Sequence, residues 1–346
     1  MKGSIAELGY LTKDNFLALR ILAAVLVIYG HSFAVTQPNG EIDLLLKLNW
    51  GRYSGDFAVA IFFVISGFMV TGSYLRRDNF IGFIQARLLR IVPAYLVVII
   101  GSVIFIGPSV TTLTLREYYS SPETIAYFIQ NITFWSDLSW LLPGVFEGQP
   151  YVVVNGSLWT IPAEFRMYIV VGVLGVMGLL ARRYVATPIL VIAFVFSIYD
   201  PTLFSKNVDA VRIGGYFCLG IIAQLYKNEI AIRHEFMLLL IVLCFFSRHS
   251  IFYFYILAST IAYFCFWFAF KLGHIDIEKF GDPSYGIYLW GWPMQQLIVN
   301  SVPTVTPYIN AAIAIPAAML LGYISWHLIE AKFLSFKKSV KVETVT

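Results

Sequence analysis

The chain has 346 residues, of which 59% are hydrophobic and only 13% are Asp, Glu, Lys or Arg. Soluble domains contain roughly 25% charged residues, so this composition excludes a water-soluble enzyme and a disordered protein. The formal net charge of +4 excludes a protein that wraps nucleic acid, because it is small and spread along the chain. We therefore expect a membrane protein that has the lipid bilayer, and no nucleic acid, as a partner.

Ten apolar segments approach the length of about 20 residues that a bilayer-spanning helix needs. They predict an all-α fold, a polytopic bundle of about ten transmembrane helices that forms a single domain over residues 1–346 with its core at about 10–336. The segments are 17–36, 57–75, 91–107, 158–180, 185–199, 210–226, 235–248, 250–270, 284–301 and 308–329.

The distribution of Lys and Arg predicts the orientation of this bundle. With a cytoplasmic N-terminus, sixteen of these residues fall in segments inside the cell and five in segments outside. Because cytoplasmic loops are enriched in Lys and Arg, both termini are predicted to be cytoplasmic, including the basic tail 337–346. The longest connection, 108–157, is then an outer loop, and a loop of that length is usually functional or a cover.

Two ionisable residues lie in the first apolar segment, where each would cost several kcal/mol if left unpaired. Arg20 and His31 are eleven residues apart, so on a helix they share one stripe and lie about 16 Å apart along the axis. Arg20 could simply extend to the headgroups, and His31 could be a packing residue. Their shared stripe favours a functional role for both.

Arg87 and Arg90 are spaced to share a helical face just before the third segment. With Arg20 they could form a cationic cluster at the cytoplasmic end, and guanidinium groups are well suited to bind phosphate. The plainer alternative for this pair is anchoring at the cytoplasmic surface. The sequence shows no metal-ligand spacing, since Cys218, Cys244 and Cys265 all lie in apolar runs.

Glu164 lies in the first half of the fourth segment, at about the depth of His31 below the outer surface. A His31–Glu164 pair is therefore possible, and Ser157, seven residues before Glu164, would lie on the same face. The alternative is that Glu164 belongs to a structural ion pair.

Six separated pieces of the chain resemble the acyltransferase-3 family of bacterial integral-membrane O-acyltransferases. They cover nearly the whole chain. The pieces are Arg20 and His31 with ten residues between them, GDFAVAIFFVISGFMV (55–70), Arg87 and Arg90, SLWTIPAE (157–164), DPSYGIYLWGWPMQQ (282–296) and SWHLIEAKF (325–333).

This resemblance implies an enzyme of the bacterial cytoplasmic (inner) membrane that moves an acyl group, usually acetyl, from cytoplasmic acyl-CoA to a hydroxyl of a cell-surface or lipid-linked polysaccharide. Acyl-CoA would be a donor substrate rather than a permanently bound cofactor. Arg20, Arg87 and Arg90 would hold its phosphates. His31 would be the general base and Glu164 would orient it, as in a catalytic triad.

Four further residues of the matching pieces are expected at the substrate-binding site: Ser157, Trp159, Tyr288 and Trp290. One departure affects the expected chemistry. Many members of the family have His where this chain has Gly291, so any catalytic role of that position is not carried over and His31 is left as the acid/base candidate. The sequence predicts neither the particular glycan nor the oligomeric state.

Two other functions could use the same residues. An ion-coupled transporter could use Arg20, His31 and Glu164 as an intramembrane relay, although the chain shows no clear internal repeat. A lipid-sugar glycosyltransferase could use Glu41 and Asp43 in the first outer loop, although two acids in a loop are usually there for solvation.

Overall fold

The structure is a computed structural model that describes residues 3–37, 41–77, 79–133 and 138–336, so the predicted basic tail 337–346 lies outside the described residues. These residues form helices and two isolated bridges, with no strand among them. The all-α prediction is therefore confirmed.

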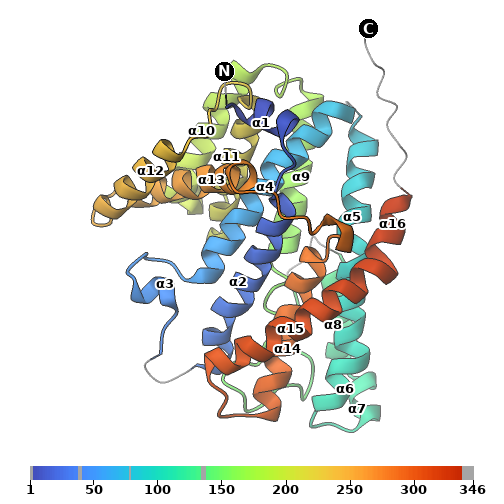
Figure 1. Ribbon diagram of the computed structural model, residues 1–346. Coiled ribbons are helices and arrows are strands. Elements are labelled where there is room, and N and C mark those ends of the chain that lie inside the picture. The colour runs from blue at the N-terminus through green and yellow to red at the C-terminus, as the bar shows by residue number, and fades with distance from the viewer. Residues whose placement is uncertain (1–2, 38–40, 78, 134–137, 337–346) are drawn as a thin grey trace.

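Every predicted apolar segment contains a helix in the described part of the chain. Figure 1 shows how these helices are arranged. They are α2 (Phe16–Thr36), α4 (Ser54–Arg77), α5 (Phe80–Gly101), α9 (Thr160–Val176), α10 (Arg183–Tyr199), α11 (Val208–Leu225), α12 (His234–Phe246), α13 (Tyr253–Lys271), α14 (Ser284–Ser301) and α15 (Pro307–Ser325).

Six helical segments of the described residues are long and apolar enough to cross a membrane, which makes this a multi-pass membrane protein. Two other apolar helices, α10 and α12, are shorter. The total of about ten crossings and the cytoplasmic side of both termini stay predictions. The six segments are α2, α4, Phe80–Val110, α11, α13 and Pro307–Ser335.

The first long helix, α2, occupies the centre of the bundle and packs against α4, α13, α14 and α15. Its neighbour α4 crosses α11 with almost no side chain between the two backbones. A Cβ atom on Gly67 would lie 2.2 Å from the Phe217 carbonyl oxygen, and one on Gly220 would lie 2.2 Å from that of Val64. Small residues of this kind let helices in membranes approach closely.

Side-chain caps stabilise the first turn of two helices that carry residues of the site. The Asn79 side chain accepts a hydrogen bond from the Gly82 N–H at the start of α5, and Thr306 caps α15 with Pro307 in the first turn. Both helices then widen into a π turn, η1 (Ser102–Ile106) after α5 and η4 (Trp326–Glu330) after α15. The continuations are α6 (Gly107–Val110) and α16 (Ala331–Ser335).

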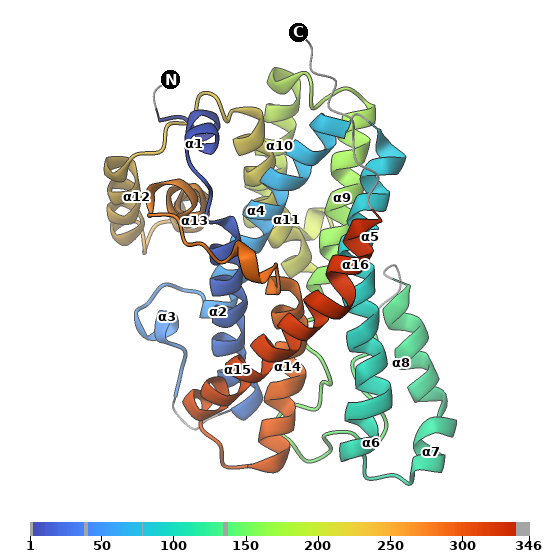
Figure 2. The same cartoon turned by 45° about the vertical axis from the view of Figure 1, so that its right-hand side comes forward.

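The predicted outer loop 108–157 is largely folded. It contains α7 (Leu115–Ser120) and α8 (Pro122–Ile132), and α8 lies along α5 (Figure 2). The fully buried side chains of Tyr118 and Tyr127 attach this cover to the bundle. The remaining short helices are α1 (Ile5–Leu11), α3 (Leu44–Lys47), η2 (Pro201–Leu203) and η3 (Glu278–Phe280).

Candidate active site

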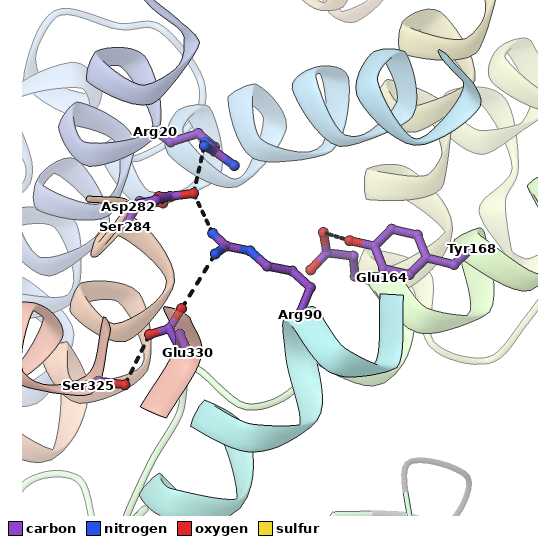
Figure 3. A network of polar contacts seen from close by, with 8 residues as sticks. All are labelled: Arg20, Arg90, Glu164, Tyr168, Asp282, Ser284, Ser325 and Glu330. Atoms are coloured by element: carbon purple, nitrogen blue, oxygen red, sulfur yellow. Dashed lines mark hydrogen bonds and ion pairs between the residues drawn. The ribbon is translucent and has the colours of Figure 1, made fainter. Parts of the chain in front are cut away.

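Two of the three candidate phosphate-binding arginines are held by carboxylates. Asp282, which precedes α14, accepts hydrogen bonds from Arg20 at 2.8 Å and from Arg90 at 2.6 Å, both on Oδ2 (Figure 3). The other guanidinium nitrogen of Arg90 lies 3.6 Å from Glu330 in the π turn η4. The predicted cationic cluster is therefore corrected: its charge is largely balanced by acidic partners from distant parts of the chain.

Two serine hydroxyls complete this network. Ser284 donates to Asp282 at 2.6 Å, and Ser325 donates to Glu330 at 3.0 Å. Burial by itself raises the pKa of Asp282, but the charges of Arg20 and Arg90 outweigh it, so the pKa of this carboxyl lies well below its usual range. Asp282 is therefore an anion that holds two helices, α2 and α5, to the start of α14.

Arg87 differs from the other two arginines because it has no ion pair within 4 Å among the described residues. Its guanidinium lies over the ring of Tyr168, 5.9 Å from the centroid. The Nε atoms of Arg87 and of Arg20 are buried without a hydrogen-bond partner in the described part of the chain. Buried donors of native proteins nearly always have partners, so these two N–H groups are available to a ligand.

The expected pairing of Glu164 with His31 is wrong. Glu164 Oε1 accepts hydrogen bonds from the Tyr168 hydroxyl at 2.6 Å and from Ser66 at 2.9 Å, and no hydrogen bond or ion pair joins it to His31. Figure 3 shows Glu164 and Tyr168 as a pair beside Arg90. Glu164 lies beside Arg90 instead, because a depth inferred from the sequence does not determine which neighbouring helix a side chain faces.

His31 is buried, with 8% of its surface exposed, and its neighbours are aromatic. Its ring meets that of Trp292 edge-on at 4.8 Å and stacks loosely on Tyr53 at 6.4 Å. Its Nδ1 atom has no hydrogen-bond partner among the described residues. The imidazole is therefore confined in position but available for a hydrogen bond to a ligand.

Three cavities with shared wall residues lie beside the arginines and His31. The arginine cavity, about 140 Å³, is lined by Arg20, Arg87, Arg90 and Glu164. The charged cavity, about 510 Å³, is lined by His31, Arg52, Asp56, Asp209 and Arg212. The loop cavity, about 710 Å³, is lined by His31, Glu41 and residues of the segment 140–159.

Shared walls show how these cavities follow one another. Val59 and Tyr288 line both the arginine cavity and the charged cavity, whereas His31, Tyr53 and Trp159 line both the charged cavity and the loop cavity. The structure thus places the predicted arginines and the predicted base in neighbouring cavities that share wall residues.

The four predicted substrate contacts divide into two groups. Trp159 and Tyr288 line the cavities, and the Tyr288 hydroxyl is fixed by Thr160 at 2.6 Å and by the Ser157 carbonyl at 2.9 Å. Ser157 and Trp290 line none of the three. Ser157 supports Tyr288 through its backbone, and Trp290 packs against α5, where a Cβ on Gly101 would approach it to 2.7 Å.

Gly291, the position at which the resemblance leads one to expect a histidine, lies against α2. A Cβ atom at this position would approach the Ile28 side chain to 2.6 Å, so a larger residue requires that side chain to shift. Asp43, considered above as half of an acidic pair, caps α3: its Oδ1 accepts hydrogen bonds from the backbone N–H groups of Leu45 and Ser54.

Sequence reasoning missed Asp282 and Glu330 as partners of the arginines. Both lie in pieces that resemble the family, and a usable signal was present: buried arginines require carboxylates. The partner of Arg20 is 262 residues away, however, and no local pattern identifies a pairing at such a separation.

Comparisons with known proteins find one family and two relatives that this chain is similar to. A family model described as an acyltransferase domain matches residues 14–327. An O-acetyl transferase of Shigella phage Sf6 is 27% identical, with 93% of this chain and 97% of the relative covered. Nodulation protein 10 of Rhizobium leguminosarum bv. viciae is 28% identical over 63% of this chain and 61% of its own length. No solved structure matches the chain.

Proposed function

Because the chain belongs to the acyltransferase-3 family, we propose that it transfers an acetyl group from cytoplasmic acetyl-CoA to a hydroxyl of a cell-surface or lipid-linked polysaccharide. The family makes it an acyltransferase rather than an ion-coupled transporter. The observation that supports this particular reaction is that the cavity of the arginines and the cavity of His31 share the wall residues Val59 and Tyr288, since the thioester and the base must meet.

The donor would enter the arginine cavity with its phosphates toward the guanidinium groups. Arg87 is the main candidate, because it has no carboxylate partner within 4 Å in the described part of the chain. Arg20 and Arg90 would add the N–H groups that Asp282 and Glu330 leave free. The pantetheine arm would then extend past Tyr288, the residue shared with the charged cavity.

His31 would act as the general base in a direct transfer. The acceptor hydroxyl oxygen attacks the thioester carbonyl carbon while His31 removes the hydroxyl proton. The C–S bond then breaks, the new ester forms, and the protonated imidazole returns the proton to the leaving CoA sulfur. Glu164 plays no direct part in this step, because it is bonded to Tyr168 and Ser66.

The enzyme would work in the bacterial inner membrane. The end of the bundle that contains Arg20 would face the cytoplasm, where acyl-CoA is available, and the loop cavity would face outward. This orientation rests on the Lys and Arg distribution of the sequence.

Mass spectrometry of surface polysaccharide tests the proposal directly. Cells that produce the wild-type protein should carry an alkali-labile acetyl ester that is missing from cells without it. His31→Ala should lower this ester at least ~100-fold, since a general base contributes that much or more. His327→Ala is the matched control, because His327 is exposed and lines none of the three cavities. An unchanged polysaccharide in the cells without the protein would contradict the proposal.

A further inference from the structure

The charged cavity contains two ion pairs that the reaction above does not use. Arg52 lies 3.6 Å from Asp56 at the start of α4, and Arg212 lies 3.4 Å from Asp209 at the start of α11. Each pair lies within or beside one helix, and both pairs line the same cavity. They are partly exposed, so each contributes little to stability, and a purely structural role explains them poorly.

The charges of this cavity differ from those of the arginine cavity. Two guanidinium groups and two carboxylates give no net charge, which does not favour a polyphosphate. They offer many hydrogen-bond donors and acceptors, and charged groups make the stronger hydrogen bonds. Such a set suits a neutral ligand with many hydroxyl groups.

Aromatic rings form much of the remaining wall. Tyr53, Trp159, Tyr216 and Phe254 line the charged cavity, and the Tyr53 hydroxyl has no hydrogen bond with any described residue. Flat apolar faces beside a few polar groups are the usual composition of a small-molecule site. With a volume of about 510 Å³, the cavity lies within the roughly 300–1,000 Å³ typical of such sites, which is enough room for a sugar ring.

The position of the charged cavity distinguishes it from the loop cavity. An acceptor hydroxyl must reach both His31 and the thioester that arrives past Tyr288. Of the two cavities lined by His31, only the charged cavity is also lined by Tyr288. The loop cavity is lined by no residue of the arginine cavity.

We propose that the charged cavity is the acceptor subsite, in which Arg52, Asp56, Asp209 and Arg212 bind the hydroxyl groups of an oligosaccharide segment and hold one of them at His31. This inference rests on the proposed function and adds where, and through which residues, the sugar is recognised. The four charged residues are binding residues and take no part in the proton transfer.

Steady-state kinetics on the full-length protein in nanodiscs separate this role from donor binding. The probe is polysaccharide extracted from the source organism, freed of esters by mild alkali and titrated at saturating radiolabelled acetyl-CoA. For Asp209→Asn and for Arg212→Gln, we expect the KM for polysaccharide to rise about tenfold, with the KM for acetyl-CoA unchanged and kcat within about threefold of wild type.

Two matched variants sharpen the result. Asp276→Asn removes one member of a similar exposed pair, Asp276 and Lys279 at the same spacing as Asp209 and Arg212, but outside the three cavities. It should leave both KM values unchanged. Glu41→Gln tests the loop cavity and should also leave the KM for polysaccharide unchanged.

Each contrary outcome has a definite meaning. A KM for polysaccharide that stays at the wild-type value in both Asp209→Asn and Arg212→Gln overturns the subsite while leaving the proposed function intact. The subsite is also overturned if these two variants raise the KM for acetyl-CoA instead. It is overturned as well if Glu41→Gln raises the KM for polysaccharide and Asp209→Asn does not. No transfer of label by the wild-type protein overturns the proposed function together with the subsite.

Discussion

The two ends of the candidate active site use buried charge in opposite ways. Around Asp282, cations and anions are paired, and the hydroxyls of Ser284 and Ser325 complete the network. Around His31 the neighbours are aromatic rings, and Nδ1 has no partner among the described residues. In this protein carboxylates therefore hold the arginine end of the site, whereas aromatic packing holds the candidate base.

Substitution of Asp282 should have the largest effect, a loss of stability from the ion-pair network with Arg20 and Arg90. Asp282→Ala leaves Arg20 and Arg90 without their shared partner, and loss of one member of a buried pair costs about 3–5 kcal/mol. We expect a markedly lower melting temperature in detergent, measured by a thiol-reactive or intrinsic fluorescence assay. Asp276→Asn should melt like the wild type. A melting temperature of Asp282→Ala equal to that of the wild type would show that the network is not structural.

Arg87 should behave differently from its two neighbours, because no carboxylate holds it. Arg87→Ala should raise the KM for acetyl-CoA about tenfold, equivalent to ~1.4 kcal/mol of binding free energy, while the melting temperature stays close to that of the wild type. Arg166→Ala is the control, because Arg166 is exposed and lines none of the three cavities. A large loss of stability with an unchanged KM would assign Arg87 to the scaffold instead.

The stability that the ion pairs of Asp282 contribute should also decrease in acid. Because the folded-state pKa of Asp282 lies below its ordinary value, the stabilisation is fully present above that ordinary value and is lost as the pH falls toward the folded-state pKa. The difference in melting temperature between wild type and Asp282→Asn should therefore shrink between about pH 5 and about pH 3. A constant difference across this range would assign the stabilisation to groups other than the ionised carboxylate.

Glu164 provides the smallest and most selective test. Glu164→Gln keeps an acceptor for Tyr168 and Ser66 and does not touch His31, so kcat should change by less than about threefold and the pH profile of kcat should keep its midpoint. Ser66→Ala is the companion variant, because it removes one of the same hydrogen bonds. A displaced midpoint in Glu164→Gln would restore the carboxylate–histidine pair that the structure lacks.

Much of the architecture followed from composition and local spacing. Helices occupy all ten predicted segments, and Arg20 and His31 do line adjoining cavities from one helix. These features depend on periodicity within a single element, which a sequence records directly.

The features that were missed or wrong depend on contacts between distant elements. Asp282 and Glu330 meet Arg90 only because the start of α14 and the π turn η4 converge on α5. Glu164 was expected beside His31 but bonds to Ser66 of α4 and to Tyr168 of its own helix. Residue spacing within one segment determines neither which distant elements converge nor which neighbouring helix a side chain faces.

The contact between Gly67 and Gly220 limits how the cavities can change shape. The helix α4 contributes walls to both the arginine cavity and the charged cavity, and at this crossing its backbone touches that of α11. Because no side chain separates the two backbones there, α4 and α11 cannot move closer together. We therefore expect any widening of the arginine cavity to come from its other walls, to which α9 and α14 contribute.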